Sequence, residues 1–330
     1  MDCDTGVDDA LAIMLALNSP ELDVRAITVC DGNVALDLCA LNTARIAAFA
    51  VRELNPAADM PVIARGREIT GKKTDAAFVH GTDGLGGVSH KIAFDGEIGM
   101  IEPDAAAVAE KFLVDAAGGG KITLVTTGPL TNLAHWTRVI PDALTGGIER
   151  VISMGGVFFE PGNVTPHAEF NIHSDARAAK TVLDFARNNG LHITFAGLDV
   201  TRRVAMTAQA LSAIRAAHPE NKSVPFIMEF NRPAMDFHKR KRGFEGEFLH
   251  DPLAAALAVD SSFCETIACD ISIEADDSEY SGRTVCAESA GGAGPFSVCT
   301  EVDTERFQDF FYSRVTGIPP DEIKRITRSL

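Results

Sequence analysis

One segment at the start of the chain decides its fold: Asp2-Cys3-Asp4-Thr5-Gly6-Val7-Asp8-Asp9, followed at once by an apolar run at 10–17 that predicts a helix. Four carboxylates around one glycine would repel one another unless a cation or a proton lay among them. The start of a helix favours negative charge, and oxygen-only ligands suit a hard cation such as Ca²⁺ or Mg²⁺. The segment therefore predicts a metal site rather than a solvated acidic turn.

Two other kinds of acidic loop resemble this segment. An EF-hand loop carries a glutamate at its twelfth position, but the twelfth residue counted from Asp2 is Ile13, which excludes it. The Asp-x-Asp start of the aspartate-nucleophile phosphatases matches residues 2–6 in part, although their later lysine and acidic loop have no convincing copy. From this segment alone, a phosphatase and a non-catalytic calcium-binding module stay open as alternatives.

The rest of the chain alternates short apolar strands with helices. The expected strands are 24–30, 61–65, 122–125, 151–154 and 192–196, and the expected helices are 36–52, 104–117, 130–139 and 176–188. Such alternation implies right-handed crossovers and a mostly parallel sheet with helices on both faces. The segments 269–273, 284–287 and 296–299 predict a small antiparallel C-terminal addition, followed by a helix at 304–315. We expect an α/β fold with a Rossmann-like open sheet, and one domain over residues 1–330.

Composition excludes several classes of protein. A chain of 330 residues, 46% of them hydrophobic, can bury a large core without disulfides. The net charge of −16 argues against a nucleic acid or an anionic membrane as partner. The seven cysteines are odd in number and contain no Cys-x-x-Cys pair, which is typical of reduced thiols in the cytoplasm. No apolar run is long enough to span a membrane.

Several further motifs, taken with the opening segment, give the chain a family resemblance. They are Asp31-Gly32-Asn33, His80-Gly81-Thr82-Asp83-Gly84-Leu85-Gly86, Thr126-Thr127-Gly128-Pro129-Leu130-Thr131-Asn132, Met154-Gly155-Gly156, Asn163, Ala168-Glu169-Phe170-Asn171 and His250-Asp251-Pro252. In this order they resemble the motifs of the calcium-dependent nucleoside hydrolases, and they extend over nearly the whole chain. The resemblance implies hydrolysis of the N-glycosidic bond of ribonucleosides to ribose and free base.

The resemblance also implies a set of site residues. The Ca²⁺ ligands would be the carboxylates of Asp4, Asp9 and Asp251 and the backbone carbonyl oxygen of Thr127. The residues that would face the ribose are Asp8, Asn33, Asn163, Glu169 and Asn171. Asp8 and Asp9 are neighbours at a helix start, about 100° apart around the helix axis, so one can face the metal while the other faces the sugar.

Catalytic roles follow from these positions. Asp4 would be the general base, because it would contact both the metal and the attacking water. His250, beside Asp251, and His80, in the glycine-rich loop, are the candidates for protonating the departing base. The expected partner is a small-molecule nucleoside, without nucleic acid or membrane, and the expected assembly is a homodimer or homotetramer.

Three local expectations remain. The family has an apolar strand directly before its first aspartate, whereas here only Met1 precedes Asp2, so the motif would lie at a frayed end. We expect either that further residues precede Met1 or that a neighbouring strand is left exposed. Trp136 is expected in the core, and the basic run 238–242 is expected to be a solvated loop.

Overall fold

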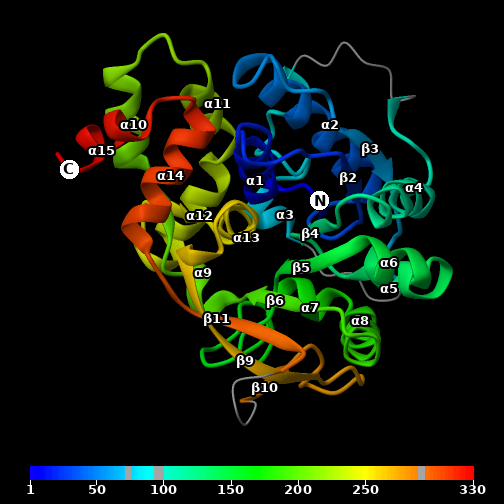
Figure 1. Ribbon diagram of the computed structural model, residues 1–330. Helices are drawn as coiled ribbons and strands as arrows, with labels where there is room; N and C mark the ends of the chain where they lie inside the picture. The colour runs from blue at the N-terminus through cyan, green and yellow to red at the C-terminus, as the bar shows by residue number, and fades with distance from the viewer. Residues whose placement is uncertain (71–75, 93–99, 289–293) are drawn as a thin grey trace.

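The computed structural model describes residues 1–70, 76–92, 100–288 and 294–330, and its centre is a nine-stranded sheet (Figure 1). The strands are β1 (Asp2–Cys3), β2 (Ala26–Val29), β3 (Val62–Arg65), β4 (Ile122–Thr126), β5 (Ile148–Met154), β6 (Ile193–Ala196), β9 (Cys264–Ile273), β10 (Thr284–Glu288) and β11 (Phe296–Val302). Their order is β10-β9-β11-β6-β5-β4-β1-β2-β3. The pairs from β3 to β11 are parallel, and β9 pairs antiparallel with both of its neighbours.

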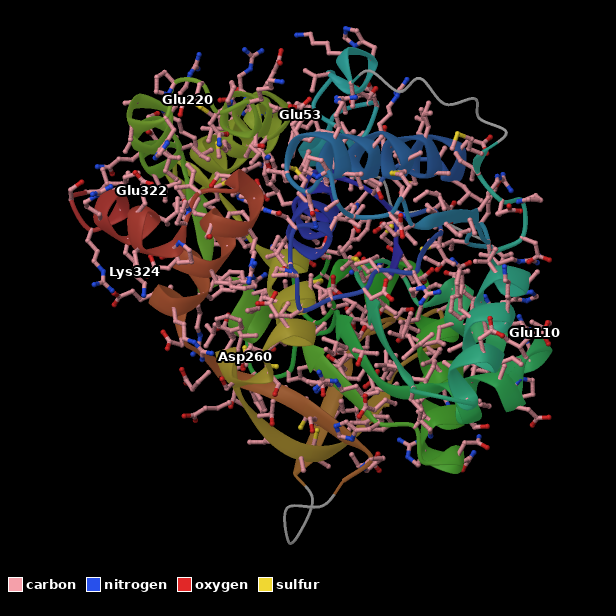
Figure 2. The ribbon with its side chains drawn as sticks, turned by 45° about the horizontal axis from the view of Figure 1, so that its top comes forward. Glu53, Glu110, Glu220, Asp260, Glu322 and Lys324 are labelled. Carbon is pink, nitrogen blue, oxygen red and sulfur yellow. The ribbon has the colours of Figure 1, made fainter. Side chains whose placement is uncertain are left out.

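Helices cover both faces of this sheet, as the alternating pattern predicts. One apolar core includes side chains of α1 (Val7–Leu17), α2 (Leu36–Glu53), α13 (His250–Val259) and α14 (Thr304–Thr316). The other includes side chains of α4 (Ala105–Ala117), α5 (Thr131–Val139), α6 (Pro141–Gly147) and α8 (Ala176–Asn189). Charged side chains such as Glu110 and Lys324 point outward from the helices (Figure 2).

Smaller elements complete the fold. These are α3 (Ala77–His80), α7 (Phe170–Ser174), α9 (Leu198–Thr201), α10 (Ala208–Ala217), α11 (Ser223–Phe230), α12 (Arg232–Arg242) and α15 (Pro320–Thr327), with a two-stranded antiparallel ribbon of β7 (Ala205–Thr207) and β8 (Gly246–Phe248). Short 3-10 turns lie at Ser89–Lys91 and Ser261–Phe263. The sequence pattern did not predict the β7–β8 ribbon, because each strand has three residues, too few to reveal a period.

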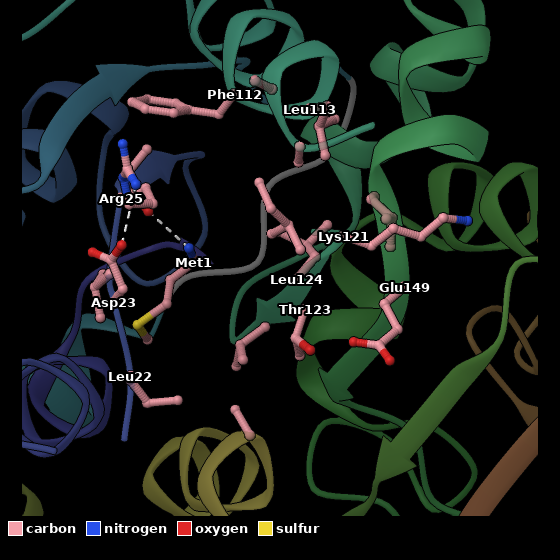
Figure 3. Close-up of a pocket in the computed structure, with 18 of the residues that line it drawn as sticks. Met1, Leu22, Asp23, Arg25, Phe112, Leu113, Lys121, Thr123, Leu124 and Glu149 are labelled. Carbon is pink, nitrogen blue, oxygen red and sulfur yellow. Dashed lines mark hydrogen bonds and ion pairs between the residues drawn. The ribbon is translucent and has the colours of Figure 1, made fainter. Parts of the chain in front are cut away.

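The start of the chain lies inside the sheet. Asp2 is in register with Thr28 of β2 and with Thr126 of β4, and the ammonium group of Met1 donates a hydrogen bond to the carbonyl oxygen of Ala26 at 2.8 Å. The expectation of a frayed end is therefore wrong, since strands on both sides hold this segment. A cavity of about 730 Å³ lies beside Met1, lined in part by Leu124 (Figure 3).

Most element boundaries agree with the sequence pattern to within two residues at each end. Trp136 is buried in the second core, as expected. The expectation of a loop at 238–242 is wrong, because these residues form the last turns of α12 and His238 is buried. None of the seven cysteines, all of which the structure describes, forms a disulfide. Within the part of the chain that the structure describes, no helix is both long and apolar enough to cross a membrane.

Candidate active site

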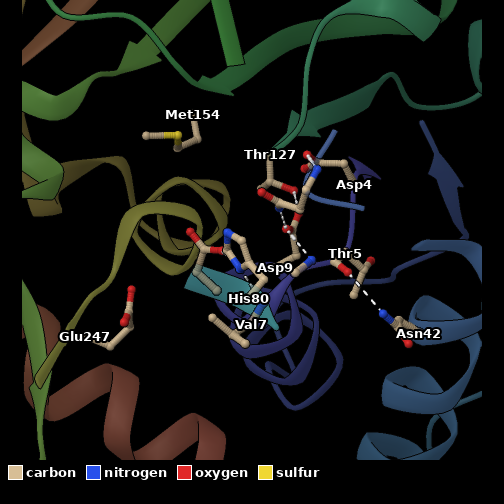
Figure 4. Close-up of polar contacts among 12 residues, drawn as sticks. Asp4, Thr5, Val7, Asp9, Asn42, His80, Thr127, Met154 and Glu247 are labelled. Carbon is tan, nitrogen blue, oxygen red and sulfur yellow. Dashed lines mark hydrogen bonds and ion pairs between the residues drawn. The ribbon is translucent and has the colours of Figure 1, made fainter. Parts of the chain in front are cut away.

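Acidic and amide side chains gather where several parallel strands end. Asp4 directly follows β1, Thr127 directly follows β4, and Asn33 lies in the loop after β2. The carboxyl ends of parallel strands meet at one edge of a sheet, which is where open α/β sheets bind ligands. Figure 4 shows Asp4, Asp9 and Thr127 grouped around the start of α1, with His80 beside them.

Three carboxylates come together from two helices. Oxygens of Asp8, Asp9 and Asp251 all lie within 4.8 Å of one another, and the three side chains are buried or nearly so. Asp8 and Asp9 are in the first turn of α1, and Asp251 is in the first turn of α13. Asp4 is outside this three-residue group, but its negative charge is close enough to raise the pKa of Asp251. We call Asp4, Asp8, Asp9 and Asp251 the acidic end of the site.

Local hydrogen bonds fix two of these carboxylates. Asp9 Oδ2 accepts from the backbone N–H of Gly6 at 2.9 Å and from the side-chain amide of Asn33 at 3.1 Å, while Oδ1 accepts from the Thr127 hydroxyl at 2.7 Å. Asp4 Oδ2 accepts from the backbone N–H of Asn33 at 2.8 Å. Glycine at position 32 is required by this packing, because a Cβ there would lie 2.0 Å from Asp4 Oδ2.

Burial is the main reason that the pKa values of the carboxyl groups at the acidic end are raised. It raises the pKa of Asp9 to about 6, with a further contribution from the charge of Asp8. Burial also raises the pKa of Asp4 and of Asp251 well above the usual range for a carboxyl group. Asp4 Oδ1 and Asp8 Oδ1 are buried without a hydrogen-bond partner. Buried carboxylates with unpartnered oxygens fit a hard divalent cation, which would favour their charged forms.

The amide and carboxyl residues after β4 and β5 hold the loops of the site together. The side-chain amide of Asn171 donates to the carbonyl oxygen of Thr127 at 2.7 Å and to that of Met154 at 3.2 Å. The carboxylate of Glu169 caps α7 by accepting from the N–H groups of Asn171 and Ile172, and it also accepts from that of Gly156. Burial raises the pKa of Glu169 to about 7.

A cavity of about 390 Å³ opens from the acidic end. Most of the sequence-predicted residues line this one cavity: Asp8, Asp251, Asn33, Thr127, Asn163, Glu169, Asn171, His80 and His250. Asp4 and Asp9 are not among its lining residues. Asn163 is exposed.

Both candidate histidines are neutral at physiological pH. His80 Nδ1 accepts from the backbone N–H of Val7 at 3.1 Å and lies 4.0 Å from Asp8 Oδ1. Burial lowers the pKa of His80 to about 4. His250 Nδ1 is 2.7 Å from the Thr201 hydroxyl, and burial lowers the pKa of His250 to about 3. Each histidine therefore has one ring nitrogen engaged by the protein.

Asp2 does not belong to the acidic end, although it is part of the same motif. Its Oδ1 accepts from the Thr28 hydroxyl at 2.6 Å and from the side-chain amide of Asn132 at 2.7 Å. Asp2 thus ties β1 to β2 and to the start of α5. The sequence pattern carries no signal for this role. Alternation along an extended chain would place Asp2 and Asp4 on one face, and they separate because β1 ends at Cys3.

Sequence reasoning missed the opposite wall of the cavity. Three rings line it, those of Phe78, Phe237 and Phe248, together with the buried side chains of His238 and Glu247. His238 Nε2 lies 3.5 Å from Glu247 Oε1, and burial raises the pKa of Glu247 to about 7. We call these five residues the aromatic end. The abrupt change from the basic run to Phe244–Phe248 was the one available signal in the sequence.

Comparison with known proteins agrees with this geometry. A sequence model described as inosine-uridine preferring nucleoside hydrolase matches residues 1–309. The pyrimidine-specific ribonucleoside hydrolase RihA of Photobacterium profundum is 34% identical over 322 residues, which cover 96% of this chain and 98% of the relative.

The chain belongs to the inosine-uridine preferring nucleoside hydrolase family.

Solved structures of nucleoside hydrolases have the same fold. A plant nucleoside hydrolase, PpNRh1, aligns with a TM-score of 0.81 at 28% identity, over 96% of this chain and 97% of that one. The purine-preferring ribonucleoside hydrolase from Gardnerella vaginalis aligns with a TM-score of 0.78 at 29% identity, with the same coverage. This nucleoside hydrolase therefore acts on the N-glycosidic bond of ribonucleosides, and the phosphatase alternative is set aside.

Proposed function

We propose that this nucleoside hydrolase is Ca²⁺-dependent and holds the ion with Asp4, Asp9, Asp251 and the carbonyl oxygen of Thr127. The observation that carries the proposal is the convergence of the carboxylates of Asp8, Asp9 and Asp251, with the buried Asp4 close to them. Asp4 Oδ1 and Asp8 Oδ1 have no hydrogen-bond partner, so they are available to a cation. A bound calcium ion would supply positive charge that orients the ribose hydroxyls and a water molecule and makes that water more acidic.

The chain's own residues divide the remaining work. Asp4 accepts a proton from the water molecule. At the same time the oxygen of that water bonds to C1′ of the ribose, and the C1′–N bond breaks. Positive charge develops on the sugar during this step, and the negative acidic end offsets it. Asp8, Asn33, Asn163, Glu169 and Asn171 hold the ribose, since all five line the cavity beside the acidic end.

The departing base takes the electron pair of the broken bond and needs a proton. His250 is our first candidate to assist it, because it lines the cavity beside Asp251 and Thr201 engages only its Nδ1. As a neutral imidazole, His250 would donate a hydrogen bond from Nε2 to the departing base and keep its own proton, and the proton that the base takes up would come from solvent. His80 is the second candidate, since its Nδ1 accepts from Val7 and its neutral ring carries the proton on Nε2.

We also propose that the protein works in the cytoplasm as a homodimer or homotetramer. Reduced cysteines support the compartment. Exposed apolar side chains, among them Phe159 and Val285, support self-association. Light scattering of the purified protein would measure its mass, and a monomer at micromolar concentration would contradict the assembly.

One assay tests the activity and the metal together. The protein is incubated with inosine, uridine and p-nitrophenyl riboside, and separately with p-nitrophenyl phosphate, with added Ca²⁺ or with a chelator. We expect free ribose from the ribosides in Ca²⁺ only, and no phosphate release. Calcium binding without ribose release would contradict the proposal, and equal turnover in chelator would contradict the role of the metal.

A further inference from the structure

The aromatic end contains a buried acid whose outer oxygen has no partner. Glu247 is 3% exposed, and its Oε1 lies 3.5 Å from His238 Nε2. Glu247 Oε2 and His238 Nδ1 are both buried without a hydrogen-bond partner. An unpaired buried polar atom costs free energy, so two such atoms on adjacent side chains in a cavity indicate a ligand that bonds to them.

The backbone around Glu247 is held firmly. Glu247 is the middle residue of β8 and is in register with Met206 of β7. The imidazole of His238 contacts the ring of Phe248, with centroids 5.1 Å apart, and Phe237 contacts Phe78 at 5.3 Å. Phenylalanine rings thus pack beside His238, in the same cavity as Glu247. In Figure 4, Glu247 and Asp4 are drawn on opposite sides of His80.

We propose that Glu247, together with His238, binds the hydrogen-bonding edge of the nucleobase and selects bases that carry a ring N–H beside a carbonyl group, such as uracil, hypoxanthine and guanine. The inference rests on the proposed binding of the ribose at the acidic end, because a nucleoside held there directs its base to the other end of the same cavity. The planar base would lie against the phenylalanine rings of that wall.

The hydrogen-bonding capacity of the Glu247 carboxylate determines which nucleobases it prefers. An ionised Glu247 is only an acceptor, so its Oε2 can take the ring N–H of uracil or of a 6-oxopurine. His238 Nδ1 is buried without a partner, and in the tautomer that carries the ring proton on Nδ1 it can donate to the adjacent carbonyl oxygen. Cytosine and adenine present a lone pair at the ring position, which would face Glu247 acceptor to acceptor.

The test compares Glu247→Gln with Glu245→Gln. Glu245 is its neighbour on the approach to β8, but its side chain is 61% exposed and pairs with Lys239 outside the cavity. For Glu247→Gln we expect kcat/KM on uridine and inosine to fall about 10-fold or more, as expected when a buried partner is lost. Turnover of cytidine should fall less or rise, and 3-methyluridine should be a poor substrate of the unchanged enzyme.

p-Nitrophenyl riboside lacks the hydrogen-bonding edge of a nucleobase. It therefore distinguishes a failure of the proposed hydrolase function from a failure of the inference about Glu247. Its turnover in Ca²⁺ should stay within about two-fold in both variants, which also shows that they fold. No release of ribose from this substrate, uridine or inosine by the unchanged enzyme would overturn the proposed function itself. Normal turnover of it, with an unchanged uridine-to-cytidine ratio in Glu247→Gln, would overturn the inference.

Two further results bear on the structural alternative. A merely structural Glu247 would lower the unfolding temperature and slow all substrates alike. A larger loss on cytidine than on uridine would mean that Glu247 binds an exocyclic amino group, which also overturns the stated selection. His238→Gln provides an independent variant, and we expect it to lower kcat/KM on uridine while leaving p-nitrophenyl riboside unaffected.

Discussion

The two ends of the cavity are built in different ways. The acidic end comes from the loop that directly follows β1 and from the first turns of α1 and α13. Its side chains are fixed by hydrogen bonds from backbone N–H groups, such as those of Gly6 and Asn33. The aromatic end comes from α3, α12 and β8, which lie outside the central sheet.

We infer from this difference that the acidic end carries out the reaction and that the aromatic end selects the substrate. A sheet edge holds its residues at fixed spacing, so the steps common to every nucleoside take place there. Short elements packed around that edge can change without disturbing the sheet. We therefore expect changes at the acidic end to affect all substrates, and changes at the aromatic end to affect some and spare others.

The largest expected effect comes from the ligand carboxylate with the most hydrogen bonds. Asp9→Asn should abolish calcium binding at micromolar concentration and lower kcat about 10³-fold on every substrate, because the ion contributes several kcal/mol to the transition state. Calorimetry and ribose release measure the two effects. Normal calcium affinity in the variant would show that Asp9 is not a ligand.

Asp4→Asn tests the general base at the same end. We expect kcat to fall at least 10²-fold, equally on uridine and on p-nitrophenyl riboside, because both need an activated water. The Asn33 N–H can still bond to the amide oxygen, so the fold should be kept. Calcium affinity must be measured beside the rate, and near-normal turnover at saturating calcium would eliminate Asp4 as the base.

His250→Ala tests whether His250, which lines the cavity beside Asp251, assists the departing base. We expect a loss of about 10²-fold on uridine or inosine and little loss on p-nitrophenyl riboside, whose phenolate leaves without a proton. If His250 only orients Asp251, both substrates should slow alike and calcium affinity should fall. That outcome would direct attention to His80.

The smallest expected effect is on stability. Without calcium, the free energy of unfolding should fall as pH rises from about 4 to 7. Burial raises the pKa of Asp2 and of Asp9 to about 6 and that of Glu169 and of Glu247 to about 7. Between the usual carboxyl pKa and these values, the folded state binds more protons than the unfolded state, so stability decreases with pH.

Two buried histidines oppose this trend. Their pKa values are lowered, so below about pH 6.5 the unfolded state binds the extra protons. The buried carboxyl groups with raised pKa outnumber them, and calcium should flatten the dependence by favouring the charged carboxylates. Thermal unfolding at several pH values, with chelator and with calcium, measures both curves. A chelated protein that gains stability toward pH 7 would contradict the prediction.

The sequence alone was enough to predict the α/β fold and the shared location of the family motifs. Hydrophobic period and length identify strands and helices locally, and parallel strands must end at one edge. Asp8, Asp9, Asn33 and Thr127 are therefore predictable neighbours, because each is only a few residues from the end of an element at that edge.

Tertiary structure decided the rest. It directed Asp2 to Thr28 and Asn132 and away from the acidic end, because its place on β1 turns it toward those side chains. It also buried His238 against Glu247, although His238 begins the run 238–242 that reads as basic and solvated. Such burial depends on which surface an element packs against, and a short helix or three-residue strand carries no period that reveals that surface.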